Sequence, residues 1–171
     1  MRAFIVGCGR VGAGLAERLA RAGHEVTIVD INGDSFNRLP HDFGGRAIRG
    51  DGTDEDVLRR AGAEGVDLFF ALTEGDNRNV LTAQLAAETL AVHKVVAKIN
   101  DPVRAEAYTA LGIATLCRTQ MLVDALASYS GMTDAMGVAG VASPTGHHPG
   151  DGHGATGDVQ TTMAGAPETE A

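Results

Sequence analysis

The stretch FIVGCGRVGAGLAERL, residues 4–19, decides the fold of this chain. It opens with three apolar residues, its first glycines have the spacing GxGxxG, and a segment of helical period follows. A strand, a glycine turn and a helix in this order begin a βαβ unit of the kind that binds a dinucleotide. In that unit Gly7 permits the tight turn, Gly9 lets phosphate oxygens approach backbone amides, and Gly12 lets the helix pack close to the strand. The alternative is a structural glycine turn without a ligand.

Short apolar runs continue to alternate with longer segments of helical period, which indicates parallel strands joined by helical crossovers. The predicted strands are residues 3–6, 25–30, 46–49, 68–72, 95–99 and 114–116. Because such crossovers are right-handed, these strands predict an α/β fold, a Rossmann-like doubly wound parallel sheet with the strand order 3-2-1-4-5-6.

Side-chain spacing and capping residues place the helices. The first helix has Val11, Leu15 and Leu19 on one apolar face and ends near Gly23. Thr53 is the predicted N-cap of a later helix. Further helices are predicted at about 76–89, 102–112 and 120–130.

Length, charge and cysteine content narrow the function classes. A chain of 171 residues suits one domain and excludes a complete two-domain dehydrogenase. The net charge of −8 excludes a protein that wraps nucleic acid or coats an anionic lipid surface. Because Cys8 and Cys117 have no framework spacing, we expect two reduced thiols in a cytosolic protein. With no apolar run of about 18 residues, we expect a soluble chain that reaches a membrane through a partner.

The composition changes near Gly137, after which the sequence has no Leu, Ile, Phe, Lys or Arg. Such a segment buries too little apolar surface to offset its ordering entropy. We therefore predict a folded domain over residues 1–130 and a disordered tail over residues 137–171. The tail histidines, His147, His148 and His153, have no rigid scaffold to hold a metal, so we interpret them as incidental composition.

Asp30 ends the second predicted strand, close to the ~20 residues past the glycine motif at which a carboxylate meets the ribose hydroxyls of a bound dinucleotide. A carboxylate repels a 2′-phosphate, and Ile31 and Asn32 supply no cation beside it. The sequence therefore favours NAD(H), or another adenine nucleotide with a free ribose, over NADP(H). The alternative is that Asp30 caps the helix that begins near Gly33.

Arg10 stands in the glycine loop at the start of the first helix. A guanidinium at a helix N-terminus is unfavourable without an anion, because the helix dipole is already positive there. We expect Arg10 to contact a phosphate, either of its own ligand or of one held by a neighbouring subunit, and a solvated arginine is the alternative. Cys8 is expected to contribute its backbone only, although a helix N-terminus can activate a thiol.

Six ordered blocks of the sequence resemble the RCK N-terminal domains, the nucleotide-binding regulatory subunits of Trk and Ktr potassium uptake systems. The resemblance runs from residue 1 to about residue 128. It implies a cytosolic homodimer or higher ring that docks beneath a membrane potassium-translocating subunit and changes its gating when the bound nucleotide changes. The blocks are GCGRVG at 7–12, GHEVTIVD at 23–30, GDGT at 50–53, DVLRRAG at 56–62, ALTEGDNRN at 71–79 and VAKINDP at 96–102.

The resemblance also implies roles for individual residues. Gly7, Cys8, Gly9, Arg10 and Val11 correspond to the phosphate loop, followed by Gly12, with Asp30 as the ribose ligand, Asp51 near the adenine, Thr73 and Glu74 in the crevice, and Lys98 as the basic residue of the nucleotide site. Alternatives stay open for three of these residues. Asp51 can be a turn acid, Thr73 can cap the helix after the fourth strand, and Lys98 can pair with Asp101.

Two departures from the family pattern bear on the ligand and the partners. ATP-gated members have a metal-binding glutamate at the position of Thr109, so we predict no metal site here. The RCK C-terminal domain is also missing from the sequence. The resemblance therefore implies that a second RCK chain supplies that domain, or that the regulator operates with the N-terminal fold alone.

The sequence shows no spacing typical of a catalytic triad or a Cys/His pair, so we expect a binding module and not an enzyme. NAD(H) is the expected cofactor, with ATP and ADP as alternatives. A small NAD-dependent oxidoreductase and a stand-alone nucleotide or redox sensor are the competing hypotheses. The helix at residues 120–130 has an apolar face for a partner subunit, and packing on its own sheet is the alternative.

Overall fold

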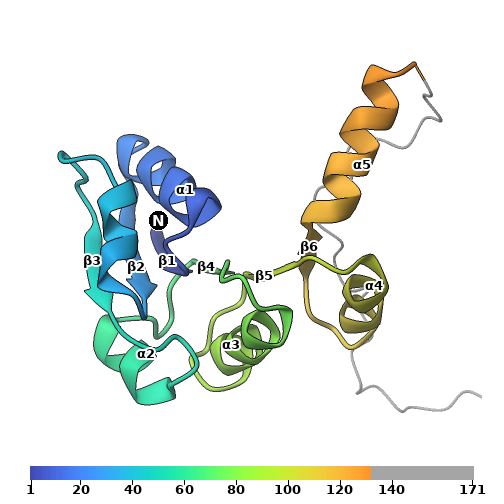
Figure 1. Ribbon diagram of the computed structural model, residues 1–171. Coiled ribbons are helices and arrows are strands. Elements are labelled where there is room, and N and C mark those ends of the chain that lie inside the picture. Colours follow the sequence, from blue (N-terminus) through green and yellow to red (C-terminus); the bar gives the residue numbers. More distant parts are fainter. Residues whose placement is uncertain (132–171) are drawn as a thin grey trace, which may run out of the picture.

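The computed structural model describes residues 1–131 of the chain. Its strands form one parallel sheet in the order β3-β2-β1-β4-β5-β6, which confirms the predicted doubly wound fold (Figure 1). The predicted tail at residues 137–171, with its three histidines, lies outside the described residues. The strands are β1 Arg2–Val6, β2 Glu25–Asp30, β3 Arg46–Arg49, β4 Leu68–Ala71, β5 Val95–Ile99 and β6 Thr115–Cys117.

The helices connect these strands and fall close to the predicted ranges. One cap differs from the prediction, because α2 is capped by Asp54, which accepts a hydrogen bond from the Val57 amide, and not by Thr53. Thr53 instead donates both its amide and its hydroxyl to Asp51. The helices are α1 Arg10–Arg21, the 3-10 helix η1 Gly33–Arg38, α2 Glu55–Ala61, α3 Asp76–Glu88, α4 Pro102–Ala110 and α5 Arg118–Tyr129.

Both faces of the sheet are covered near its centre. Alternate residues of a strand point to opposite faces, so Phe4 lies under α2 and α3 while Ile5 lies under α1. The rings of Phe4 and Phe69 stack with centroids 5.3 Å apart, which joins β1 to β4 in the middle of the core. Figure 1 shows α1 on one side of the sheet and α2, α3 and α4 on the other.

The fully buried residues of α1 are all small, while Leu15 and Leu19 pack partly buried against the same core. Gly12, Ala13 and Ala16 are buried there, whereas Val11 is 50% exposed, so the predicted face is wrong at Val11. The reason is steric, because Gly12 approaches the backbone of the glycine loop and this contact fixes the rotation of the helix. Small side chains bring the helix axis close to the strands, and the N-terminus of α1 therefore stands directly above the end of β1.

Helix α5 departs from the sheet. It has no buried residue, and it projects away from β6 in Figure 1, so the alternative that it packs on its own sheet is wrong. Leu122, Leu126 and Tyr129 are 60%, 59% and 93% exposed. Among the described helices, none combines the length and the apolar character that crossing a membrane requires.

Candidate nucleotide-binding site

The sequence-predicted site residues gather at one edge of the sheet. All the strands are parallel, so their carboxyl ends meet there. The strand order reverses between β1 and β4, and ligands of open α/β sheets bind outside the strand ends at such a switch point. Following the edge from β3 to β5, the chain presents Asp51, Asp30, the glycine loop, Thr73 and Lys98 in that order.

The glycine loop contains three glycines. Packing requires glycine at two of these positions, Gly7 and Gly12, and not at Gly9. Gly7 has φ +104°, and a Cβ atom on it would lie 2.8 Å from the Thr73 nitrogen. A Cβ atom on Gly12 would lie 1.9 Å from the Gly7 carbonyl oxygen. Gly9, the N-cap of α1, has an ordinary φ of −76°, and its Cβ atom would meet nothing within 4 Å. Packing within residues 1–131 therefore does not require glycine at this position, where glycine also serves as a favourable N-cap.

Asp30 ties the end of β2 to the glycine loop. One carboxylate oxygen accepts a hydrogen bond from the Cys8 amide at 2.7 Å, and the other accepts one from the Asn32 amide at 2.8 Å. Helix η1 is capped by Asn32, so the alternative role of Asp30 as its cap is wrong. Each carboxylate oxygen has a second acceptor position, and no hydrogen-bond donor within residues 1–131 fills it.

Arg10 and Cys8 differ in accessibility. Arg10 is exposed at the first turn of α1, and no hydrogen bond or ion pair within residues 1–131 holds its guanidinium. Cys8 is fully buried, and burial, followed by the charge of Asp30, raises the pKa of its thiol to about 11. Its sulfur lies 3.4 Å from the Ser35 carbonyl oxygen. The thiol is therefore protonated at neutral pH, which supports the expectation that Cys8 contributes its backbone only.

Asp51 follows β3 and closes a turn. The same oxygen accepts hydrogen bonds from the Thr53 amide at 2.9 Å and from the Thr53 hydroxyl at 2.8 Å. These two bonds, the amide first, lower the pKa of Asp51, and the charge of Arg78 lowers it further. Asp51 is thus a turn acid that stays ionised. The other carboxylate oxygen has no hydrogen-bond partner among the described residues.

Thr73 lies at the switch point and is held by a buried asparagine. The amide and hydroxyl of Thr73 donate to the Asn79 Oδ1 at 2.8 and 2.6 Å, and the Asn79 Nδ2 donates to the Thr73 and Lys98 carbonyl oxygens. Gly75 is the N-cap of α3, so Thr73 does not cap that helix. Glu74 is exposed beside it. Asn79 was not among the predicted site residues, and the signal for it was a polar residue one turn into α3, next to the apolar residues of the buried face.

Lys98 is a buried cation. It is 6% exposed, and strand alternation places it on the face opposite Ala97 and Ile99. Burial first, and then the charge of Arg118, lower its pKa, while Glu74 and Asp76 act in the opposite direction. Asp101 caps α4 and pairs with Arg104, so the alternative pairing of Lys98 with Asp101 is wrong. An anion at the switch point would compensate the buried charge of Lys98.

The position of the family's metal-binding glutamate is structural in this chain. The Thr109 hydroxyl donates to the Ala105 carbonyl oxygen and lies 2.8 Å from the Thr115 hydroxyl, which joins α4 to β6. Within residues 1–131, no three side chains of the His, Cys, Asp or Glu types come close enough to hold a metal ion.

These features define the chain as a Rossmann-fold domain with a dinucleotide-type glycine loop at its switch point. Residues 3–119 match the TrkA-N domain model, and the chain belongs to that family. This confirms the resemblance to RCK N-terminal domains.

Relatives and solved structures agree with this assignment. The chain is 45% identical over 124 residues to a Trk system potassium uptake protein TrkA of Streptomyces coelicolor, covering 72% of this chain and 56% of that protein. It therefore spans about half the length of this relative. Two solved structures share the fold alone, at 21% and 19% identity. The first is a Shewanella denitrificans Kef C-terminal domain in its AMP-bound form, with a TM-score of 0.64 and coverage of 81% of this chain and 85% of that one. The second is a GsuK channel bound to NAD, with a TM-score of 0.60 and coverage of 72% of this chain and 22% of that one.

Proposed function

We propose that this chain binds an adenine nucleotide at the switch point, with NAD(H) as the first candidate and ATP and ADP as the others. The observation that carries the proposal is the open space beside Gly9. Packing explains the glycines on either side of it in the motif, Gly7 and Gly12, but not Gly9 itself. A residue without a side chain, at the N-cap of a helix, leaves the first amides of α1 accessible to phosphate oxygens. The NAD-bound and AMP-bound neighbours of the same fold support this class of ligand.

The charges along the strand edge fit the two ends of such a ligand. Asp30 and Asp51 stand over β2 and β3, where the ribose and the adenine would lie, and a carboxylate there rejects a 2′-phosphate. Arg10 is the first residue of α1, and Lys98 lies near the end of β5. The negative charge of the phosphates would offset the positive charges of both side chains. The remaining proposed contacts are Gly7, Cys8, Val11 and Gly12 of the loop, together with Thr73 and Glu74.

We further propose that the chain is a regulatory subunit of a potassium uptake system. Membership of the TrkA-N family and the names of the curated relatives support this role. In this proposal the chain gates a Trk or Ktr type membrane subunit from the cytoplasmic side and catalyses no reaction. A nucleotide can change the gating of the membrane subunit only if it binds one arrangement of the assembly more tightly than the other.

The exposed apolar face of α5 supports assembly into a homodimer or ring. A helix of 12 residues with no buried side chain is marginal in water, so we propose that α5 packs on a second copy of the chain. A second RCK chain is the other partner that the family suggests. The test is a sedimentation measurement on Leu126→Asp, which we expect to shift the dimer toward monomer, with Asp124→Ala as the control. An unchanged dimer would remove α5 from the interface.

Thermal shifts with NAD, NADH, ATP and ADP, each with and without magnesium, test the nucleotide proposal. A ligand that binds the folded state raises the melting temperature. The decisive variant is Gly9→Ala, which costs at most about 1 kcal/mol as a poorer N-cap and places a methyl group where the phosphates would lie. We expect it to lose the ligand-induced shift, while Gly14→Ala on the same helix retains it. A wild-type chain that ignores all four nucleotides would overturn the proposal.

Two further experiments separate the competing functions. Co-purification with a multispanning membrane protein that transports potassium supports the regulatory role. Nucleotide binding without any such partner favours a stand-alone sensor. Turnover in a hydride-transfer screen would instead favour an oxidoreductase.

A further inference from the structure

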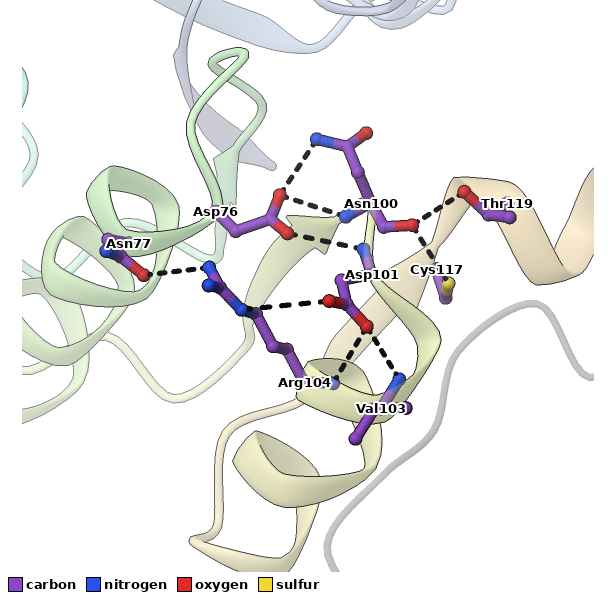
Figure 2. A network of polar contacts seen from close by, with 8 residues as sticks. All are labelled: Asp76, Asn77, Asn100, Asp101, Val103, Arg104, Cys117 and Thr119. Atoms are coloured by element: carbon purple, nitrogen blue, oxygen red, sulfur yellow. Dashed lines mark hydrogen bonds and ion pairs between the residues drawn. The ribbon is translucent and has the colours of Figure 1, made fainter.

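Asn100 joins three segments that are far apart in the sequence (Figure 2). It directly follows β5, and its amide and side-chain nitrogens both donate to the Asp76 Oδ1, at 2.9 and 2.8 Å. The side-chain nitrogen also donates to the Glu74 carbonyl oxygen at 3.2 Å. On its other side, the Asn100 carbonyl oxygen accepts a hydrogen bond from the Thr119 hydroxyl at 2.6 Å. Asn100 thus lies between the loop before α3 and the start of α5.

The side-chain amide of Asn100 has only one acceptable orientation. Its nitrogen faces two acceptors, and rotating the amide would place its oxygen against the Asp76 carboxylate. In the orientation present, the Asn100 Oδ1 is the one fully buried side-chain nitrogen or oxygen without a hydrogen-bond partner in the described part of the chain. An unpaired buried carbonyl is unfavourable. The bonds to Asp76 and Glu74 therefore hold Asn100 in an arrangement that leaves a polar atom unsatisfied.

Asp76 extends the same junction to α4. Its second carboxylate oxygen accepts a hydrogen bond from the Asp101 amide at 3.3 Å, and Asp101 in turn caps α4. The ends of β4 and β5 and the start of α4 are thereby connected through one carboxylate. A displacement of the loop that contains Glu74 and Asp76 would change the position of the Asn100 side chain, because within residues 1–131 its nitrogen donates hydrogen bonds to that loop alone.

The start of α5 is also linked to the proposed site through charge. Arg118, the first residue of α5, lies close enough to Lys98 for its charge to lower the pKa of that lysine. An anion over Lys98 would attract both cations. Hydrogen bonding through Asn100 and the charge of Arg118 therefore act on the same end of the same helix.

We propose that Asn100 is a positioning residue that couples the nucleotide crevice to helix α5. The inference rests on the proposed function, because it requires a ligand at the switch point. A nucleotide that draws Glu74 and its loop toward itself moves Asp76 and Asn100, and the Thr119 hydroxyl transmits this shift to the first turn of α5. The helix that reaches other subunits thus changes its orientation with occupancy of the site.

The test is hydrogen exchange of the α5 amides in the full chain, measured with and without NADH and with and without ATP. For a coupling of ordinary strength we expect the ligand to change α5 exchange by about fivefold or more. Thr119→Val removes the bond at an exposed position, so this variant should keep nucleotide affinity within about twofold and lose most of the change. Thr119→Ser, which retains the hydroxyl, should restore it, and Asn77→Ala on α3 should behave as wild type.

The outcomes separate the two proposals. If neither nucleotide binds the wild-type chain, the proposed function fails, and the coupling fails with it. If a nucleotide binds and α5 exchange stays constant, or if Thr119→Val keeps the full change, only the coupling through Asn100 is overturned.

Discussion

The carboxylate of Asp30 and the backbone amide of Cys8 are joined by a 2.7 Å hydrogen bond, so the end of β2 is fastened directly to the glycine loop beside it. The bond spans 22 residues of sequence and lies between adjacent strands. Asp30 therefore fixes the conformation of the loop. In the proposed site, its remaining acceptor positions would also bind the ligand.

Asp30→Ala should weaken binding of the preferred nucleotide by about tenfold or more, because charge-assisted hydrogen bonds of ~1.5 to 3 kcal/mol are lost. Asp34→Ala, at an exposed acid on η1, is the control and should bind as wild type. Titration calorimetry measures both variants. Equal affinity of Asp30→Ala and wild type would remove Asp30 from the site.

Gly12→Ala should destabilise the fold by about 2 kcal/mol or more, because the new methyl group overlaps a backbone carbonyl that cannot move aside. Gly14→Ala, two residues further along α1, meets no atom within 4 Å and should stabilise the helix by about 0.5 to 1 kcal/mol. Urea denaturation of the two variants gives the comparison. Similar midpoints would show that the loop yields to the extra methyl group.

Lys98→Met should stabilise the ligand-free chain by about 1 kcal/mol and weaken nucleotide binding, since it removes an unpaired buried charge. The pKa of Lys98 is lowered on folding, so its charge costs stability at every pH below the lowered value. The cost disappears as the pH rises toward the ordinary value of 10.5. The stability advantage of Lys98→Met should therefore shrink at alkaline pH.

Thermal denaturation between neutral and alkaline pH tests this dependence, with Lys94→Met at an exposed lysine near the start of the same strand as the control. Because a bound anion raises the pKa of Lys98, nucleotide binding to the wild-type chain should also take up protons at alkaline pH. A Lys98→Met chain that is less stable than wild type at neutral pH would contradict the assignment of an unpaired charge.

Asn79→Ala should cost about 2 to 4 kcal/mol, because it leaves the Thr73 amide and the Lys98 carbonyl oxygen without their partner at a fully buried position. Asn77→Ala is the matched control, since Asn77 is exposed and has one long bond, to Arg104 at 3.4 Å. We expect it to change stability by less than about 0.5 kcal/mol. Chemical denaturation distinguishes the two asparagines.

The fold was predictable because its signals are local and periodic. The glycine loop, the apolar strands and the right-handed crossovers determine the strand order, and the structure agrees with each predicted strand to within one residue. The rotation of α1 was not predictable from periodicity. It depends on the contact between Gly12 and the Gly7 carbonyl, and this contact exists only once the chain has folded.

The positions of the candidate site residues were predictable where one residue type has a specific place in a motif, as at Asp30 and the glycines, which the structure brings to one edge of the sheet. The roles of Asn79 and Asn100 depend on partners that lie 19 and 24 residues away in the sequence. No local pattern encodes such pairs. The capping of α2 shows the same limit, because Thr53 and Asp54 are both good caps, and the bonds that Thr53 makes to Asp51 decide between them.

In the proposed assembly α5 gains its tertiary support from a second copy, so the order of this exposed helix would depend on the concentration of the chain. A short helix without tertiary support unravels readily, so dilution should reduce helical content at the C-terminal end of the described residues before the sheet is affected. Circular dichroism over a dilution series would record this loss. At low concentration the proposed contact helix would therefore unfold first, while the sheet and the glycine loop would stay folded.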